Sequence, residues 1–524
     1  MAEQQNNAPS HYGFAMPMFK EWVPERLRPW LYVYLAFTFQ LSGGVYIGSL
    51  NEMMGSMSLM REDILMCLYA SLCGLAFTFP ILFRTKFRFT NRTLLLTSVI
   101  GIALCNVLGM FVTSLPLLWL ICFIAGCFKI QGTFECMSNI QLWMTPKRDF
   151  RIFFPLLHLW IMLSISVSDM AAAWFCHIAT FHYVAWLMTG IMLFNALWLF
   201  LVTRHFRFMR PLPFYSIDWL GAILWVLSVM QTVYICCYGE FYNWWDSPVI
   251  RTLTVTATVT FVLSVTRMFL IRHPYIEPKM WRNRKLPFIL ILATIQEALL
   301  ATEHVLEEVF YEGGMEWHSY TTATLNYPSM AGSIFACLFA LVWFNVWNQN
   351  RSRLIAVGIT VFIMYSLYFY FNISTDISIS QLYLPMFLRS CAATILGIVM
   401  LCTIQSAMSF MVFFQSLAIF QTLHLMVGGV IGAACYAFGL RYLMADNMAL
   451  YGDSIEVMPE QIGGIFSQLQ VISIKQLYGI VTYVAIALLI AVLVYDMPFR
   501  REHYPSIPSW TAVGKVLRKH LRRK

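Results

Sequence analysis

The chain consists of apolar blocks of about 20 residues separated by short polar or charged stretches. A block of this length crosses the hydrocarbon core of a bilayer as one helix. A membrane β-barrel would instead alternate apolar and polar residues over about 10 positions, a pattern that this chain does not show. The pattern therefore predicts an all-α polytopic membrane protein.

Fourteen blocks are predicted to be transmembrane helices, at 30–50, 64–83, 94–113, 115–143, 153–176, 182–203, 216–238, 250–271, 287–310, 320–344, 352–372, 383–405, 409–438 and 472–496. We interpret their order as six helices, two extra helices and six more. The predicted divisions are an interfacial segment at 1–29, a first bundle at 30–210, the extra pair with a linker at 211–285, a second bundle at 286–499, and a basic tail at 500–524.

The basic residues predict how these helices are oriented. With both termini in the cytoplasm, 29 of the 35 lysines and arginines fall in cytoplasmic segments. One span more or fewer would reverse this asymmetry downstream, so an even count with both ends inside is favoured. The longest outer segment, at 441–470, is acidic and is predicted to be a periplasmic loop. The tail at 500–524 is predicted to lie as a basic helix on anionic lipid.

Composition excludes several other classes of protein. Residues are 59% hydrophobic and only 12% charged, whereas soluble domains carry about 25% charge. The net charge is +9, and the basic residues that produce it lie between the apolar blocks. They therefore indicate the orientation of the helices rather than nucleic-acid binding. The 13 cysteines lie mostly inside apolar blocks without a CxxC pair, which predicts core residues rather than disulfides or a zinc site. We expect no cleaved signal peptide.

The most informative blocks are 115–143 and 153–176, because they carry Lys129, Glu135 and Asp169. Charge at that depth is costly and is by default a candidate for a transport or proton pathway. A carboxylate suits proton coupling because burial brings its proton affinity towards neutral pH. The alternative is a structural role, such as an ion pair or a cap. His158 and His177 lie nearer the helix ends and are interpreted as core or interface residues.

Helical geometry limits how these groups can combine. Glu135 is about 240° around the helix from Lys129, so the two face different neighbours. Lys129 and Asp169 lie at different depths of their helices, so we do not expect a direct pair. Polar lining of a cargo path is predicted for Gln40 and Gln131.

The block at 287–310 is the second charged helix. Further proton-coupling candidates are Glu297, Glu303, His304 and Glu307, with Arg389 as a partner for one of the acids. The helix is predicted to run outward, which would place Glu307 and Glu308 near the outer surface, in contact with solvent. An acid-rich helix favours cationic cargo or a proton antenna, and the alternative is an outer vestibule without a coupling role.

Several short motifs recur in an order that is informative. The extra pair begins with DWLGAIL at Asp218 and turns at GEFYNWWDSP, from Gly239 to Pro248. The others are FKIQG at 128–132, FHYVAW at 181–186, RSCAATILGI from Arg389 and MVGGVIGAA at 426–434. Together they resemble the fourteen-span drug:proton antiporters of the major facilitator superfamily, the EmrB/QacA type.

The chain departs from that family at three places. The loop between the second and third spans, PILFRTKFRFTNR, lacks the expected acid. The expected arginine of the fourth span is Phe128, with Lys129 beside it. The antiporter motif of the fifth span is replaced by Ser168-Asp169 and Ala172-Ala173. The coupling machinery of the family is therefore not carried over residue by residue.

The resemblance implies two six-helix bundles that rock around a midplane site. It implies an inner-membrane exporter of lipophilic drugs or amphiphiles in a Gram-negative bacterium, driven by the proton gradient without a cofactor. A periplasmic adaptor and an outer-membrane channel are the implied partners. The alternatives are another cargo, such as a siderophore, lipid or metabolite, or a membrane-embedded enzyme or receptor. We find no nucleophile–base, HxxxH, GxGxxG or Walker pattern, so an enzyme or an ATP-driven pump is disfavoured.

Overall fold

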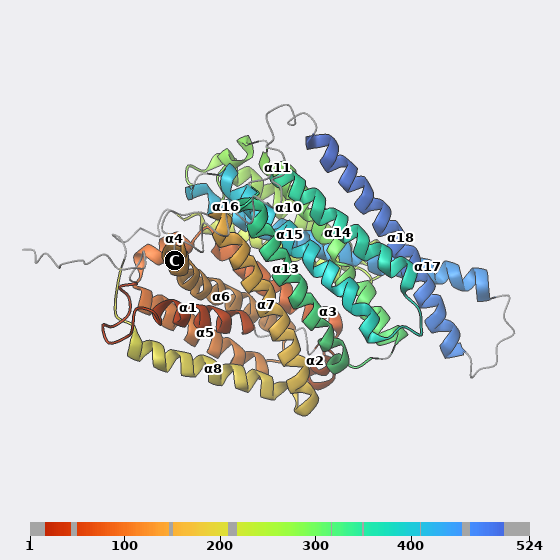
Figure 1. The fold of residues 1–524 in the computed structure, drawn as a ribbon, viewed down its shortest axis with the longest axis horizontal. Helices are drawn as coiled ribbons and strands as arrows, with labels where there is room; N and C mark the ends of the chain where they lie inside the picture. Colours follow the sequence, from red (N-terminus) through yellow and green to blue (C-terminus); the bar gives the residue numbers. More distant parts are fainter. Residues whose placement is uncertain are drawn as a thin grey trace, which may run out of the picture.

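The computed structural model describes residues 16–42, 50–145, 150–207, 217–283, 285–315, 317–347, 350–408, 410–452 and 462–496. The predicted basic tail at 500–524 lies outside the described residues. Within them the chain is mainly helical, and the long helices cross the molecule in two groups at different inclinations (Figure 1).

The helices are α1 (Arg28–Leu41), α2 (Leu50–Met57), α3 (Arg61–Thr78), α4 (Leu82–Arg88), α5 (Asn91–Phe111), α6 (Leu115–Met144), α7 (Phe150–Ile178), α8 (Phe181–Val202), α9 (Trp219–Tyr238), α10 (Pro248–Leu270), α11 (Lys285–Leu300), α12 (Ser319–Thr322), α13 (Asn326–Asn345), α14 (Arg351–Asn372), α15 (Tyr383–Ala407), α16 (Phe410–Gln421), α17 (Gly429–Gly452) and α18 (Ile462–Asp496). Short 3-10 turns are η2 (Trp244–Asp246), η3 (Pro278–Arg282), η6 (Ala323–Leu325) and η7 (Ile379–Leu382), and π turns are η4 (Glu303–Glu307), η5 (Phe310–Gly314) and η8 (Thr422–Gly428).

The number of spans differs from the prediction. Twelve helical stretches of the described chain are long and apolar enough to cross a bilayer. A thirteenth is formed only if α3 and α4, bent by 64° at Pro80, count as one span; proline lacks the N–H that would continue the helix. The predicted span 30–50 contains α1, whose 14 residues reach only about 21 Å; residues 43–49 lie outside the described residues. The described residues thus show 12 spans rather than the predicted 14.

The prediction of a loop at 441–470 is also mostly wrong. α17 continues to Gly452 and α18 already begins at Ile462, so only 453–461 remain between them, outside the described residues. The two extended ends are held together by Asn447, which is 2% exposed. Its amide donates to Ser473 Oγ at 2.8 Å and to Gln476 Oε1 at 3.1 Å. Asn447 therefore faces a neighbouring helix, where the sequence pattern suggested solvent, whereas Asp446 beside it is exposed.

The helices form two packed halves with a hairpin between them. In the first half α1, α3, α5, α6, α7 and α8 pack on one another, and in the second half α11 and α13 to α18 do so (Figure 1). α7 also packs along α13 and α15 of the second half. α9 and α10 pack on each other as a hairpin, and α9 touches both α3 and α17. The described residues therefore show two packed halves and a hairpin, but their 12 spans do not reproduce the predicted fourteen helices.

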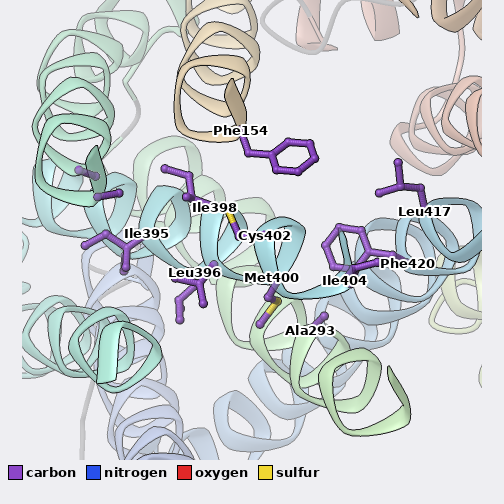
Figure 2. Packing of buried hydrophobic residues seen from close by; sticks show 14 of the residues in the cluster. Phe154, Ala293, Ile395, Leu396, Ile398, Met400, Cys402, Ile404, Leu417 and Phe420 are labelled. Atoms are coloured by element: carbon purple, nitrogen blue, oxygen red, sulfur yellow. The ribbon is translucent and has the colours of Figure 1, made fainter. Parts of the chain in front are cut away.

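One apolar core runs through both halves. Phe154 reaches from α7 towards α15 and α16, where Cys402, Leu417 and Phe420 lie (Figure 2). The ring of Phe414 in α16 contacts Phe83 and Phe134 of the first half at 4.4 and 5.3 Å between ring centroids. We call the end of the helices that carries Phe83 the inner end and the end that carries Arg61 the outer end, after the predicted orientation. Aromatic contacts therefore join the halves at the inner end.

Candidate functional site

A carboxylate and an imidazole meet where the two halves adjoin. Glu297 Oε2 in α11 lies 3.2 Å from His424 Nε2 in η8, and their side chains are 19% and 11% exposed. Within the described chain neither ring nitrogen of His424 has an aligned hydrogen bond. The imidazole is therefore held beside the carboxylate without an aligned hydrogen bond to it. Such a pair is able to exchange a proton without a large rearrangement.

Glycines let η8 and α17 approach α11 closely enough for this contact. A Cβ atom on Gly428 would lie 2.6 Å from the carbonyl oxygen of Thr294, and one on Gly432 would lie 2.5 Å from that of Ala298. Small residues permit such backbone approach between membrane helices. π turns are often found at functional sites, and η8 is one. The MVGGVIGAA motif therefore has a packing role next to Glu297.

The first half contributes His158 and Tyr69 to the same region. His158 of α7 is 9% exposed and lies near enough to His424 for an electrostatic interaction. Tyr69 of α3 lies near enough to Glu297 for an electrostatic interaction. The ring of His158 rests on Gly397 of α15, and its Nε2 has no hydrogen-bond partner among the described residues. Titratable groups from both halves thus surround one junction.

The fit of His158 against Gly397 gives a stability prediction. A Cβ atom at position 397 would lie 2.5 Å from His158 Cε1. We expect Gly397→Ala to cost about 1–3 kcal/mol in unfolding free energy, since the packed ring has to move. The same substitution should cost much less in a His158→Ala background. Unfolding titrations in detergent measure both values. Gly190→Ala is the control, because nothing lies within 4 Å of that Cβ position; an equal cost in both backgrounds would contradict the fit.

Arg389 joins two of the predicted acids in the second half. Its guanidinium lies 2.9 Å from Glu303 Oε1 and 2.5 Å from Glu307 Oε2. Tyr365 and Tyr311 also donate their hydroxyls to Glu307. The predicted partnership of Arg389 with one of the acids is confirmed, and the structure adds a second acid. The predicted solvation of Glu307 is wrong: its side chain is 2% exposed, whereas that of Glu303 is 46% exposed.

The reason for this correction is the shape of the helix. The two π turns η4 and η5 follow α11 and wind the chain differently from an ideal helix. Glu307 thereby faces Tyr365 of α14 and Arg389 of α15. His304 is exposed, and Glu308 pairs with Arg61 of α3 rather than with solvent alone.

Glu135 lies in a closed polar network at the inner end of the first half. It is 1% exposed. Lys86 Nζ lies 3.2 Å from its Oε2, and Asn91 and Asn139 donate to its Oε1 at 2.5 and 3.2 Å. These contacts tie α4 and α5 to α6. The acid that the loop PILFRTKFRFTNR lacks is thus supplied to Lys86 by another helix.

Lys129 and Glu135 face different neighbours, as predicted. Lys129 Nζ donates to the backbone oxygen of Gln40 at 3.1 Å, in the last turn of α1. A cation there is favoured by the helix dipole. Asp169 lies within electrostatic range of Lys129. Gln40 donates to Thr133 and Gln131 to Thr97, both at 3.4 Å, so Gln131 is directed towards α5.

Sequence reasoning overlooked His424, the tyrosines around Glu307 and the role of Lys86. His424 carried a usable signal, because it is a titratable residue inside an apolar block, the criterion that selected Lys129. The tyrosines carried no distinguishing signal among 25 in the chain. Their role depends on the π winding that brings Tyr311 of η5 next to Glu307 and on the register of α14 against η4, neither of which apolar periodicity defines.

No protein-family model matches the chain, and no curated protein matches its sequence. Solved structures do match. A proton-dependent oligopeptide transporter aligns with a TM-score of 0.57 and 13% identity, over 91% of this chain and 99% of its own. The D323A mutant of the nucleoside transporter NupG aligns with a TM-score of 0.56 and 12% identity, over 89% of this chain and 99% of its own. The chain therefore shares its fold with these solved transporters. The human organic anion transporter MFSD10 also aligns, with a TM-score of 0.51 and 10% identity, over 88% of this chain and 100% of its own.

Together with the apolar helices, this result confirms the coarser prediction of an all-helical, multi-pass membrane protein. At these identities the likeness concerns the fold alone. It does not distinguish the EmrB/QacA type from other types with the same fold.

Proposed function

We propose that the protein is a proton-coupled secondary transporter that exports lipophilic or amphiphilic compounds by alternating access. The observation that carries this proposal is the Glu297–His424 pair at the junction of the two halves. The groups belong to α11 and η8, and His158 and Tyr69 approach them from α7 and α3. A rocking motion of the halves would change the surroundings of the pair, and with them its affinity for a proton.

The charge balance around α11 supports a cationic cargo. Glu303 and Glu307 share the single guanidinium of Arg389, which leaves one negative charge uncompensated. Glu307 is enclosed, so this charge is accessible at Glu303, whose side chain is 46% exposed. Aromatic residues make up 16% of the chain and there are 31 methionines, which suits an adaptable apolar path.

A second candidate is transport of an anionic or zwitterionic metabolite. Lys129 is the specific observation that favours it, because its ammonium is a partly buried cation at the end of α1, within electrostatic range of Asp169. The structural neighbours include transporters described as acting on nucleosides, organic anions and peptides. Siderophores and lipids remain within this second candidate.

Reconstitution into proteoliposomes tests the proposal. With an imposed pH gradient, we expect the protein to move ethidium against its concentration gradient and to carry protons in the opposite direction. Nigericin, which collapses the pH gradient, should abolish the accumulation. Uridine and a dipeptide serve as probes for the second candidate. Ethidium flux that does not respond to the pH gradient would contradict proton coupling, and flux of uridine or dipeptide alone would favour the second candidate.

The proposal includes an inner-membrane location in a double-membraned bacterium, with a periplasmic adaptor and an outer-membrane channel as partners. The outer ends of the helices would be the docking side. Crosslinking in whole cells followed by purification of this chain tests it. Recovery of a single-span protein with a long coiled coil would support tripartite export, and recovery of the chain alone would contradict it.

A further inference from the structure

The α9–α10 hairpin lies in the seam between the two halves. Apolar side chains of α3, α9, η8 and α17 form one cluster there, which includes Met66, Tyr69, Val233, Met426 and Val430. At the outer end polar ties run from the hairpin to both halves. We propose that this hairpin is an outer latch, which travels with the first half and whose polar tie to the second half is one breakable ion pair. The proposal rests on the alternating access proposed above.

The tie to the first half is buried. Tyr238, at the end of α9, donates its hydroxyl to Asp63 Oδ1 at the start of α3. Asp63 is 3% exposed, and its Oδ2 accepts the backbone N–H of Met60 at 2.9 Å, which caps α3. The ring of Tyr238 stacks on Tyr234 at 4.3 Å between centroids. This hydrogen bond is buried, and both of its partners are held in place by further contacts. We therefore expect it to persist when the halves move.

The tie to the second half is exposed. Glu240 Oε1 lies 2.7 Å from Arg441 Nε in α17, and the two side chains are 30% and 50% exposed. The other oxygen of Glu240 accepts the indole N–H of Trp244 at 3.0 Å, which orients the carboxylate. Ion pairs with this exposure are weak and easily exchanged for water. Separation of the hairpin from the second half therefore costs little at this contact.

A third contact joins the halves directly beside the latch. Arg61, two residues before Asp63, donates to the backbone oxygen of His304 at 2.6 Å and pairs with Glu308. α3, α9, η4 and α17 thus form a ring of contacts at the outer end. Opening that end requires the Arg61 contact to break together with one hairpin tie. The difference in burial identifies Glu240–Arg441 as the tie that breaks.

Distance measurements at the outer end test this inference. Nitroxide labels on ketone-bearing amino acids at positions 114 and 376, between α5 and α6 and between α14 and α15, report the separation of the halves without disturbing the cysteines. We expect Arg441→Gln to raise the ratio of the long-distance to the short-distance population about one-and-a-half- to fivefold. Glu240→Gln should do the same, and the double substitution should add no more.

Two further variants make the assignment specific. Tyr238→Phe removes only the hydroxyl, and because the hairpin stays on the first half in both states, it should lower stability while leaving the population ratio unchanged. Arg267→Gln is the matched control, since its ion pair with Asp218, at 2.8 Å, joins α9 and α10 within the hairpin at the inner end. An unchanged ratio in both Arg441→Gln and Glu240→Gln would overturn the latch. An equal shift in Tyr238→Phe would overturn the assignment of the hairpin to the first half.

This experiment needs neither cargo nor a pH gradient. Its result is therefore independent of whether ethidium transport is coupled to protons. A shift in the distances without proton-coupled transport would retain the latch and reject the proposed function. Proton-coupled transport without a shift in the distances would retain the proposed function and reject the latch.

Discussion

Glu297→Gln is expected to reduce accumulation of ethidium driven by a pH gradient to the level of protein-free vesicles. The amide preserves the size of the side chain and its contact with His424 but cannot carry a proton. Exchange of labelled for unlabelled ethidium across the membrane should continue, because it needs the rocking motion and not a net proton transfer. Loss of accumulation with preserved exchange is the signature of a coupling residue.

Three comparisons sharpen this prediction. Glu312→Gln makes the same chemical change at an exposed outer position and should leave accumulation unchanged. Asp169→Asn tests the carboxylate that the sequence favoured, which lies near Lys129 in the first half. His424→Asn tests whether the imidazole beside Glu297 is needed. Full accumulation in Glu297→Gln together with loss in Asp169→Asn would move the coupling role to the first half.

Much of the fold could be predicted from the sequence because one physical rule governs it. A helix that crosses lipid has to be predominantly apolar over about 20 residues, so the block from 115 to 143 is visible in the sequence despite Lys129 and Glu135, and it corresponds to α6. Breaks inside the blocks are less visible. The bend at Pro80 had a signal in the proline, whereas the π turns η4, η5 and η8 had none. They depend on contacts with helices that are distant in the sequence.

The candidate site shows the same division. Charged residues inside apolar blocks were identified individually, and Arg389 was correctly expected to partner an acid. Which residues meet was not predictable, because the Glu297–His424 contact depends on the relative register of α11 and η8. Exposure was misjudged for Glu307, where distance from the helix end suggested solvent. Two of the polar partners that bury it, Tyr365 and Arg389, lie more than 50 residues away along the chain.

Arg389→Met is expected to cause the largest loss of stability. The substitution keeps the apolar length of the side chain but leaves the carboxylate of Glu307, 2% exposed, without its cation. Removing one partner of a buried pair typically costs about 3–5 kcal/mol, because an uncompensated charge stays buried. An unfolding titration in mixed detergent micelles measures the change. A loss comparable to that of an exposed ion pair would show that Glu307 is not held in the way the structure indicates.

Double substitutions then separate the two acids that share Arg389. Arg389→Met with Glu307→Gln should recover most of the lost stability, because the buried charge is removed together with its partner. Arg389→Met with Glu303→Gln should recover little, since Glu303 is 46% exposed and is already solvated. This difference would assign Glu307 to the structural framework of the second half and leave Glu303 as the accessible negative charge. Equal recovery in the two double variants would mean that both acids bear on Arg389 alike, and the accessible charge could then not be assigned to Glu303.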